Sequence, residues 1–141
     1  MFEKILYPVD MEEPDFSQMA LEVAIAQCKI HNSELHVLTV IPGFNMPMVA
    51  SFFPEGTMEV AKKRVTEKLE RYVKDNIPSS IKVFSHVAVG PPYKEILLCR
   101  RALGANLIIL QSHNEKLDHF LGSVATKVVE QARVSVMVIR P

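Results

Sequence analysis

Gly122 and Ser123 stand at the start of an expected helix and have the features of an anion-binding site. The first backbone N–H groups of a helix, here those of Gly122, Ser123 and Val124, have no acceptor within it. Together with the Ser123 hydroxyl and the positive end of the helix dipole, they suit a phosphate group. Glycine allows a close approach because no Cβ intervenes. A second interpretation stays open, in which Gly122-Ser123 is an ordinary helix cap.

A carboxylate, Asp10, follows the first apolar run, residues 4–9. In that position it suits the hydroxyls of a ribose, or a Mg²⁺ ion that bridges phosphates. It equally suits a turn that caps the first helix. We therefore take Asp10 as a candidate nucleotide contact and as a candidate metal contact through nucleotide phosphates.

Short β-rich runs alternate with amphipathic helical patterns along the whole chain. The order β-α-β-α-β-α-β-α-β indicates an α/β fold with a parallel sheet and helices on both faces. Right-handed crossovers favour a doubly wound sheet. Asn32 is placed to end one helix as a left-handed C-terminal residue, and Gly104 ends another. Strands are expected at 4–9, 34–40, 82–89, 106–110 and 134–139, and helices at 15–30, 59–76, 90–103 and 123–132.

Ligands of such sheets bind beyond the carboxyl ends of the strands. The expected ends here are Pro8-Val9-Asp10, Val40, Gly90 and the run 110–113, which contains Gln111, Ser112 and His113. The crevice between the first and fourth strands is therefore the expected binding site.

The composition fits one soluble domain, residues 1–141, in which 48% of residues are hydrophobic. Sixteen basic and sixteen acidic residues give a formal net charge of zero. A neutral chain is a poor candidate for a nucleic-acid binder and has no broad attraction to an anionic membrane. Cys28 and Cys99 are far apart and have no metal-ligand spacing, so two free thiols are expected. With no signal-peptide pattern at the start, this indicates a cytoplasmic protein.

No catalytic residue is assigned from the sequence. Neither the GxxxxGK[ST] P-loop nor the GxGxxG fingerprint occurs. His113, Asp118 and His119 lie close in sequence, but their spacing is no recognised metal-ligand pattern. Ser112, His113 and Asp118 have the residue types of a catalytic triad, but nothing in the sequence fixes their geometry. At most, slow hydrolysis of a bound nucleotide is expected.

Two apolar segments are expected to be buried by something that the sequence does not identify. Residues 41–58 form a long irregular stretch rich in Phe and Met, which we expect to cover a ligand, a partner subunit or the core of the protein. In the last strand, 134–139, the alternating sets of side chains are Val134, Val136 and Val138 on one side and Ser135, Met137 and Ile139 on the other. An apolar edge strand is a pairing hazard, so symmetric pairing with a second copy is expected.

Several short motifs, in this order and spacing, resemble those of the universal stress protein family along the whole chain. Similarity is greatest to the small stand-alone members with a modified phosphate loop. It implies a five-stranded parallel sheet of order 3-2-1-4-5, the adenine nucleotide alpha hydrolase-like fold. It also implies binding of ATP or AMP and a homodimer, or a tetramer, that pairs its last strands. The motifs are K-I-L-Y-P-V-D, E-L-H-V-L-T-V, G-P-P-Y-K-E-I-L, A-N-L-I-I-L, L-G-S-V-A-x-x-V and V-S-V-M-V-I-R.

The resemblance also implies roles for individual residues. Pro8-Val9-Asp10 match the turn that contacts adenosine in the family, with Asp10 near the ribose and the metal. Val40 matches the residue whose backbone reads the adenine edge. Gly122-Ser123-Val124 match the phosphate-binding start of the last helix.

The chain departs from the family pattern in its phosphate loop. Gln111 and Asn114 replace two glycines of the nucleotide-binding members, and seven residues instead of nine separate Asn114 from Gly122. Fewer glycine N–H groups remain, which affects triphosphate binding more than adenosine binding. The side chains of Gln111, Ser112 and Asn114 are candidates to supply the missing donors.

Two main functions follow as hypotheses. In the first, the protein is a nucleotide-binding regulator of the stress response that acts as a homodimer and reports to another protein. In the second, the shortened loop has lost ATP binding, and the protein is a nucleotide-independent interaction module. An enzyme or flavin carrier on the same fold is a third hypothesis, supported by fold analogy alone.

Overall fold

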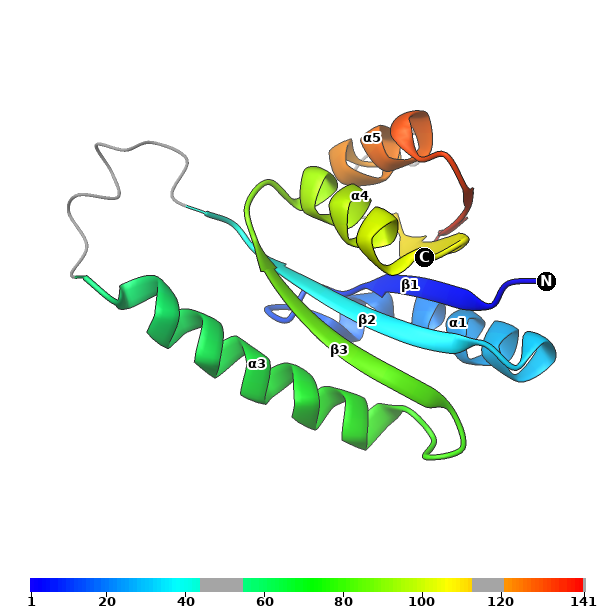
Figure 1. Cartoon of the computed structure of the whole chain (residues 1–141), viewed down its shortest axis with the longest axis horizontal. Coiled ribbons are helices and arrows are strands. Elements are labelled where there is room, and N and C mark those ends of the chain that lie inside the picture. The colour runs from blue at the N-terminus through cyan, green and yellow to red at the C-terminus, as the bar shows by residue number, and fades with distance from the viewer. Residues whose placement is uncertain (44–54, 113–120, 141) are drawn as a thin grey trace.

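The computed structural model describes residues 1–43, 55–112 and 121–140. Strands and helices alternate in the expected order, with one additional short 3₁₀ helix (Figure 1). The elements are β1 (Lys4–Pro8), η1 (Pro14–Ser17), α1 (Gln18–His31), β2 (Glu34–Ile41), α3 (Thr57–Asn76), β3 (Lys82–Val89), α4 (Pro92–Leu103), β4 (Leu107–Gln111), α5 (Ser123–Gln131) and β5 (Ser135–Ile139).

The five strands form one parallel sheet with the order β3-β2-β1-β4-β5. This is the order that the resemblance implied. Helices α1 and α3 cover one face of the sheet, and α4 and α5 cover the other (Figure 1). Chain order reverses beside β1, which places the ends of β1 and β4 next to the point where α/β sheets bind ligands.

Alternation along the strands divides the core into two layers. In β1, Ile5 and Tyr7 face α1 and α3, while Leu6 faces α4 and α5. In β4, Leu107 and Ile109 join the first layer, and Ile108 joins the second. Because both faces of these strands are buried, their sequences are continuous apolar runs rather than alternating ones.

Helix boundaries differ from the expected ones where a special backbone conformation intervenes. The first helix, expected at 15–30, is preceded by the 3₁₀ turn Pro14–Ser17, and α1 begins only at Gln18. Helix α3 begins at Thr57 because Gly56 adopts a positive φ of 84° as its N-cap. Asn32 and Gly104 end α1 and α4, as predicted, and both adopt the left-handed conformation.

The two cysteines are free thiols on opposite sides of the sheet. Burial raises the pKa of each, Cys28 and Cys99, to about 11, so both stay protonated at neutral pH. None of the helices within 1–43, 55–112 and 121–140 combines the length and hydropathy of a membrane span. Of the irregular stretch 41–58, residues 44–54 lie outside the described residues.

Candidate functional site

A cavity of about 400 Å³ opens at the carboxyl ends of β1, β2 and β4, beside the start of α5. Its size falls within the range of small-molecule pockets, roughly 300–1,000 Å³. Ser112 follows β4 but is not among the lining residues, and His113 and Asn114 lie outside the part of the chain that the structure describes. The predicted residues that line the cavity are Pro8, Val9, Asp10, Val40, Gln111, Gly122, Ser123 and Val124.

The end of β2 presents its backbone to this cavity. The Leu38 carbonyl accepts a hydrogen bond of 2.8 Å from the Val9 N–H, so Leu38 directs its peptide groups toward β1. Val40, two residues further on, directs its own N–H and C=O to the same side. Strand β1 has already ended at Pro8, so the Val40 backbone faces the cavity instead of a neighbouring strand.

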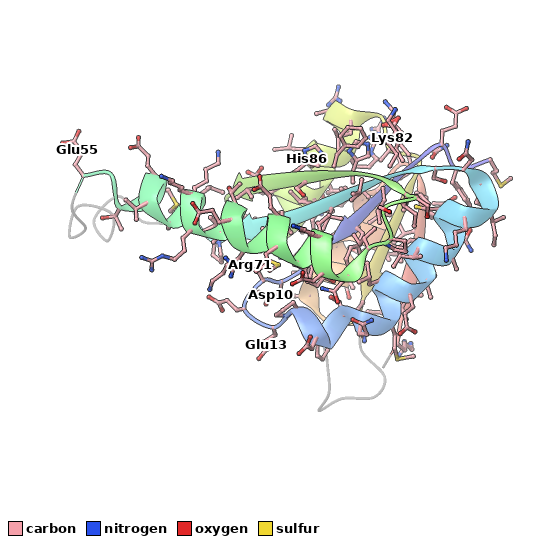
Figure 2. All side chains as sticks on the ribbon, turned by 90° about the horizontal axis from the view of Figure 1, so that it is seen from below. Asp10, Glu13, Glu55, Arg71, Lys82 and His86 are labelled. Atoms are coloured by element: carbon pink, nitrogen blue, oxygen red, sulfur yellow. The ribbon has the colours of Figure 1, made fainter. Side chains whose placement is uncertain are left out.

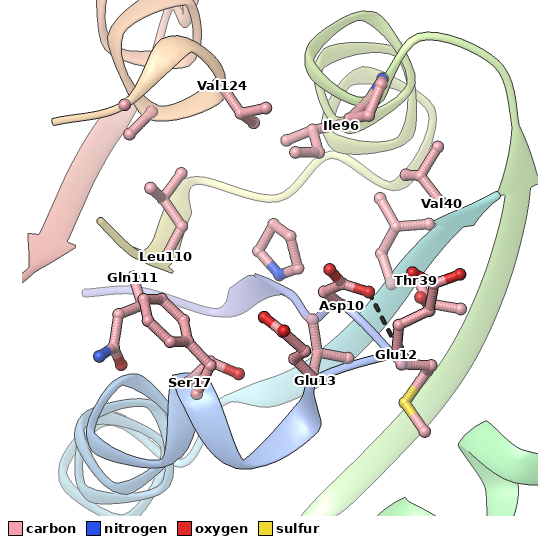
Figure 3. Close-up of a pocket in the computed structure, with 18 of the residues that line it drawn as sticks. Asp10, Glu12, Glu13, Ser17, Thr39, Val40, Ile96, Leu110, Gln111 and Val124 are labelled. Atoms are coloured by element: carbon pink, nitrogen blue, oxygen red, sulfur yellow. Dashed lines mark hydrogen bonds between the residues drawn. The ribbon is translucent and has the colours of Figure 1, made fainter. Parts of the chain in front are cut away.

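Asp10 forms the turn that leads into η1. Its Oδ1 accepts a hydrogen bond of 2.9 Å from the Glu12 N–H, and its carbonyl accepts one of 3.2 Å from the Glu13 N–H. One oxygen of Asp10 thus forms the expected turn, but Asp10 caps no helix, because the N-caps of η1 and α1 are Glu13 and Ser17. Oδ2 has no partner among the described residues, and the side chain is exposed at the cavity (Figure 3).

The turn brings two further carboxylates to the same wall. Figure 3 shows Asp10, Glu12 and Glu13 on one side of the cavity and Ile96 and Val124 on the other. The part of the lining that the structure describes includes no lysine, arginine or histidine. The described acidic, histidine and cysteine residues also form no group of three or more that could hold a metal ion. This wall therefore repels anions unless a cation accompanies them.

Gln111 does not act purely as a donor at the cavity. Its Oε1 accepts a hydrogen bond of 3.2 Å from the N–H of Ala20, in the first turn of α1. The side chain therefore satisfies one of the orphan donors of that helix. The Nε2 group has no partner in residues 1–43, 55–112 and 121–140 and remains a donor next to the cavity.

The start of α5 is open toward the cavity. Its N-cap, Gly122, has φ 88° and ψ 157° and offers no side chain to the helix. The Gly122 carbonyl accepts from the Thr126 N–H at 3.0 Å, so the helix begins normally. The N–H groups of Ser123, Val124 and Ala125 have no acceptor within the described ranges, and all three residues line the cavity. This first turn is a local anion-binding element opposite an acidic wall.

A buried hydroxyl network, not expected from the sequence, lies behind the η1 wall. The Tyr7 hydroxyl is 2.7 Å from the Ser17 Oγ and 3.1 Å from the Tyr72 hydroxyl, and it donates to the Ser17 carbonyl. Burial raises the pKa of both tyrosines, so both stay protonated. The only sequence signal was a tyrosine inside an apolar run. The network ties α3 and β1 to Ser17, which lines the cavity.

The sequence of the chain matches a family of proteins over nearly its whole length. A model of the "Universal stress protein family" matches residues 1–140. The chain belongs to the universal stress protein family. Universal stress protein G of Shigella flexneri is 30% identical over 149 residues, which cover 99% of this chain and all of that protein.

Solved structures of this family share the fold. The MJ0577 protein, a universal stress protein of Methanocaldococcus jannaschii, has a TM-score of 0.78 at 28% identity, covering 100% of this chain and 97% of that one. A universal stress protein from Archaeoglobus fulgidus, solved in complex with dAMP, has a TM-score of 0.67 at 18% identity, covering 98% of each chain. At that identity the likeness shows the fold.

Proposed function

We propose that this universal stress protein binds an adenine nucleotide in the cavity at the strand ends and acts as a homodimeric regulator in the stress response. The observation that carries the proposal is one cavity in which three features meet. They are the unpaired backbone of Val40, the carboxylate of Asp10 and the open first turn of α5. These suit, in turn, a base edge, a ribose and a phosphate.

The base and sugar are placed on the β1–β2 side. Pro8, Val9 and Ile96 give the cavity apolar walls against which a planar ring packs. The N–H and C=O of Val40 supply a donor and an acceptor for the ring edge. The unpartnered Oδ2 of Asp10 accepts from a ribose hydroxyl.

The phosphate is placed at the first turn of α5, where the N–H groups of residues 123–125 and the Gln111 amide are donors. The wall of Asp10, Glu12 and Glu13 faces it. A single phosphate is accommodated by the helix end, whereas a triphosphate needs a divalent cation, such as Mg²⁺, between its oxygens and Asp10. AMP and adenosine are therefore bound without metal, and ATP with it.

The fold neighbours support this assignment. The Archaeoglobus fulgidus relative holds dAMP, and another universal stress protein, 18% identical with a TM-score of 0.65, was solved in complex with cAMP. The same fold therefore holds nucleotides with one phosphate in those two proteins.

Mass spectrometry of freshly purified, denatured protein tests the proposal, together with calorimetric titration of adenosine, AMP and ATP with and without Mg²⁺. We expect an adenine nucleotide to be carried through purification, and ATP binding to require Mg²⁺. No nucleotide in the preparation, with no binding of any of the three ligands at millimolar concentration, contradicts the proposal.

Homodimer formation is assigned to β5, at one edge of the sheet. Val136 and Val138 pack toward one core layer and Met137 and Ile139 toward the other, yet all four are only half-buried. The Ile139 carbonyl accepts from the Ser112 N–H on the β4 side, so Val138 directs its peptide groups outward. That outer edge suits antiparallel pairing with a second β5.

Val138→Pro tests this assignment because it removes an outward N–H and leaves the β4 ladder intact. Val138→Ala is the matched control that shortens the side chain and keeps the N–H. We expect a dimer for the native chain and for Val138→Ala, and a monomer of 15.9 kDa for Val138→Pro by sedimentation. A monomeric native protein at micromolar concentration contradicts the assignment.

A second function, the nucleotide-independent interaction module, is favoured by one specific observation. The described lining carries three carboxylates and no basic residue, which is unusual for a site that binds a polyanion. This function predicts assembly that no nucleotide alters, whereas the first predicts that bound nucleotide stabilises the protein.

A further inference from the structure

A second cavity lies at the other end of α4 and α5. Its volume is about 410 Å³, and it lies between the C-terminal half of α4 and the segment where α5 leads into β5. The two helices pack side by side on the same face of the sheet (Figure 1). The lining residues are Leu97, Leu98, Arg100, Arg101, Gln131 and Arg133.

The charge of this cavity is uncompensated. Three of its six lining residues are arginines and none is acidic. None of the three guanidinium groups has a carboxylate partner in the described part of the chain. In a protein whose net charge is zero, this is a local concentration of positive charge.

One arginine also has a donor that nothing satisfies. The Nε of Arg100 is shielded from solvent and has no hydrogen-bond partner among the described residues. A guanidinium N–H that has lost water and found no acceptor is costly, and such groups mark places where an unseen acceptor belongs. A bound oxyanion would supply that acceptor.

The arginines are not needed as helix caps. Cations near a helix C-terminus often interact with its last carbonyls. In α4 the carbonyls of Arg100, Arg101 and Leu103 are already used, because Gly104 donates to the first two and Lys4 Nζ to the third. In α5 the Ala132 N–H donates to the Val128 carbonyl, and within the described residues none of the three guanidinium groups bonds to a last carbonyl of either helix. Capping therefore explains neither the buried Nε nor the convergence of arginines from two segments.

We propose that this cavity is a second anion site, which binds a small phosphate or polyphosphate anion independently of the nucleotide cavity. Guanidinium groups match phosphate oxygens in a planar, bidentate fashion. Three of them favour an anion of charge −2 or more over a single carboxylate. Leu97 and Leu98 give the same cavity an apolar side.

Calorimetric titration of the intact protein with inorganic pyrophosphate in 150 mM NaCl tests the proposal. The variants are Arg100→Lys, which keeps the charge but removes Nε, and Arg133→Gln, at an exposed position. Arg71→Gln on α3, on the opposite face of the sheet, is the control that removes one exposed positive charge elsewhere (Figure 2).

We expect saturable binding that weakens at least tenfold in Arg100→Lys and in Arg133→Gln and stays unchanged in Arg71→Gln. AMP affinity is expected to be the same in all four proteins, so failure here is distinguishable from failure of the proposed nucleotide function. Absence of pyrophosphate binding, or equal binding by Arg100→Lys, Arg133→Gln and Arg71→Gln, overturns the proposal. In the second case pyrophosphate is bound elsewhere, for example at the start of α5.

Discussion

The two cavities of this protein have nearly equal volumes, about 400 and 410 Å³, but opposite side-chain charge. Both lie along α4 and α5. Pro92 and Ile96 of α4 line the first cavity, and the C-terminal half of the same helix lines the second. The described lining of the first contains three carboxylates and no basic group, and that of the second contains three arginines and no acidic group.

In each cavity the charged side chains have the sign opposite to the partial charge of the nearby helix ends. Parallel α/β architecture gathers helix N-termini, which are partially positive, at the carboxyl edge of the sheet and helix C-termini, which are partially negative, at the other edge. Carboxylates from the β1–η1 turn face the former, and arginines surround the latter. The backbone thus sets a default charge at each end of the fold, and the side chains decide which ligands each end accepts.

The largest expected effect comes from closing the helix start in the first cavity. Gly122→Ala strains a residue at φ 88°, ψ 157° and places a methyl group at the N–H groups. Loss of one charge-assisted hydrogen bond, about 1.5–3 kcal/mol, weakens AMP binding by about 10- to 100-fold. Titration of AMP measures this, and pyrophosphate binding at the arginine cavity is expected to stay unchanged.

A matched control separates binding from strain. Gly56 is also the N-cap of a helix, with φ 84°, but it does not line the cavity. Gly56→Ala is expected to lower the free energy of unfolding by about 1 kcal/mol and to leave AMP affinity unaltered. Equal loss of AMP affinity in both variants shows that the start of α5 does not hold the phosphate.

Removing one charge from the acidic wall tests how strongly that wall repels a phosphate. Glu12 is exposed at the cavity, so Glu12→Gln reduces the repulsion of phosphate without emptying the core. With no metal present, we expect AMP to bind about two- to fivefold more tightly, because one charge at such separations contributes about 0.5–1 kcal/mol in a solvated site. Adenosine, which is neutral, serves as the internal reference and keeps its affinity.

Glu22→Gln, on an exposed position of α1, removes the same charge outside the cavity. If it tightens AMP binding as much as Glu12→Gln does, the effect depends on the net charge of the protein and not on the local charge of the cavity wall.

Much of the first cavity could be predicted from the sequence. Alternating patterns gave the element order, and the resemblance gave the strand order, so Asp10, Val40 and Gly122 were expected at one place, as found. The sequence did not predict that Glu12 and Glu13 lie on the wall. A 3₁₀ turn that begins at Pro14 orients that segment, and no hydrophobic periodicity in the sequence indicates such a turn. The binding roles of these residues stay predictions.

The rest depends on tertiary contacts. Gln111 was expected to donate to a ligand, but its oxygen binds the Ala20 N–H, which is 91 positions away in the chain. The arginine cavity was not anticipated, since Arg100 and Arg133 meet only where α4 packs beside the end of α5. Local patterns predict which elements form, while pairs of this kind arise from how the elements pack.

A smaller effect is expected from the buried hydrogen bonds that hold one wall of the first cavity in place. The first is anchored by the Tyr7–Ser17–Tyr72 network, and the second has no such link to α3. Tyr72→Phe removes one buried hydrogen bond and is expected to lower the free energy of unfolding by about 1 kcal/mol. AMP affinity should fall by less than threefold, and pyrophosphate binding should not change. A larger loss for pyrophosphate than for AMP contradicts this division of support.

The smallest expected effect is a pH dependence of the free energy of unfolding. It sets the pH range in which the two cavities can be compared in a folded protein. On β2 and β3, His36 Nδ1 lies 2.8 Å from His86 Nε2, and His86 lies on the side of β3 away from α3 (Figure 2). Burial lowers the pKa of both, although Glu34, 3.4 Å from His36 Nε2, partly offsets this for His36, and Lys4 adds to the lowering.

Because both imidazoles hold protons less well in the folded protein, the unfolded chain takes up more protons below its ordinary histidine pKa of about 6.5. Stability from this pair is therefore fully present well above that pH and is lost progressively as the pH falls through it toward the lowered pKa of each folded imidazole. The slope cannot exceed about 1.4 kcal/mol per pH unit for each proton. Urea unfolding across this pH range measures it, and His86→Gln, which keeps a hydrogen-bonding partner for His36 Nδ1, should flatten it. An equal slope in both proteins would place the titrating groups elsewhere.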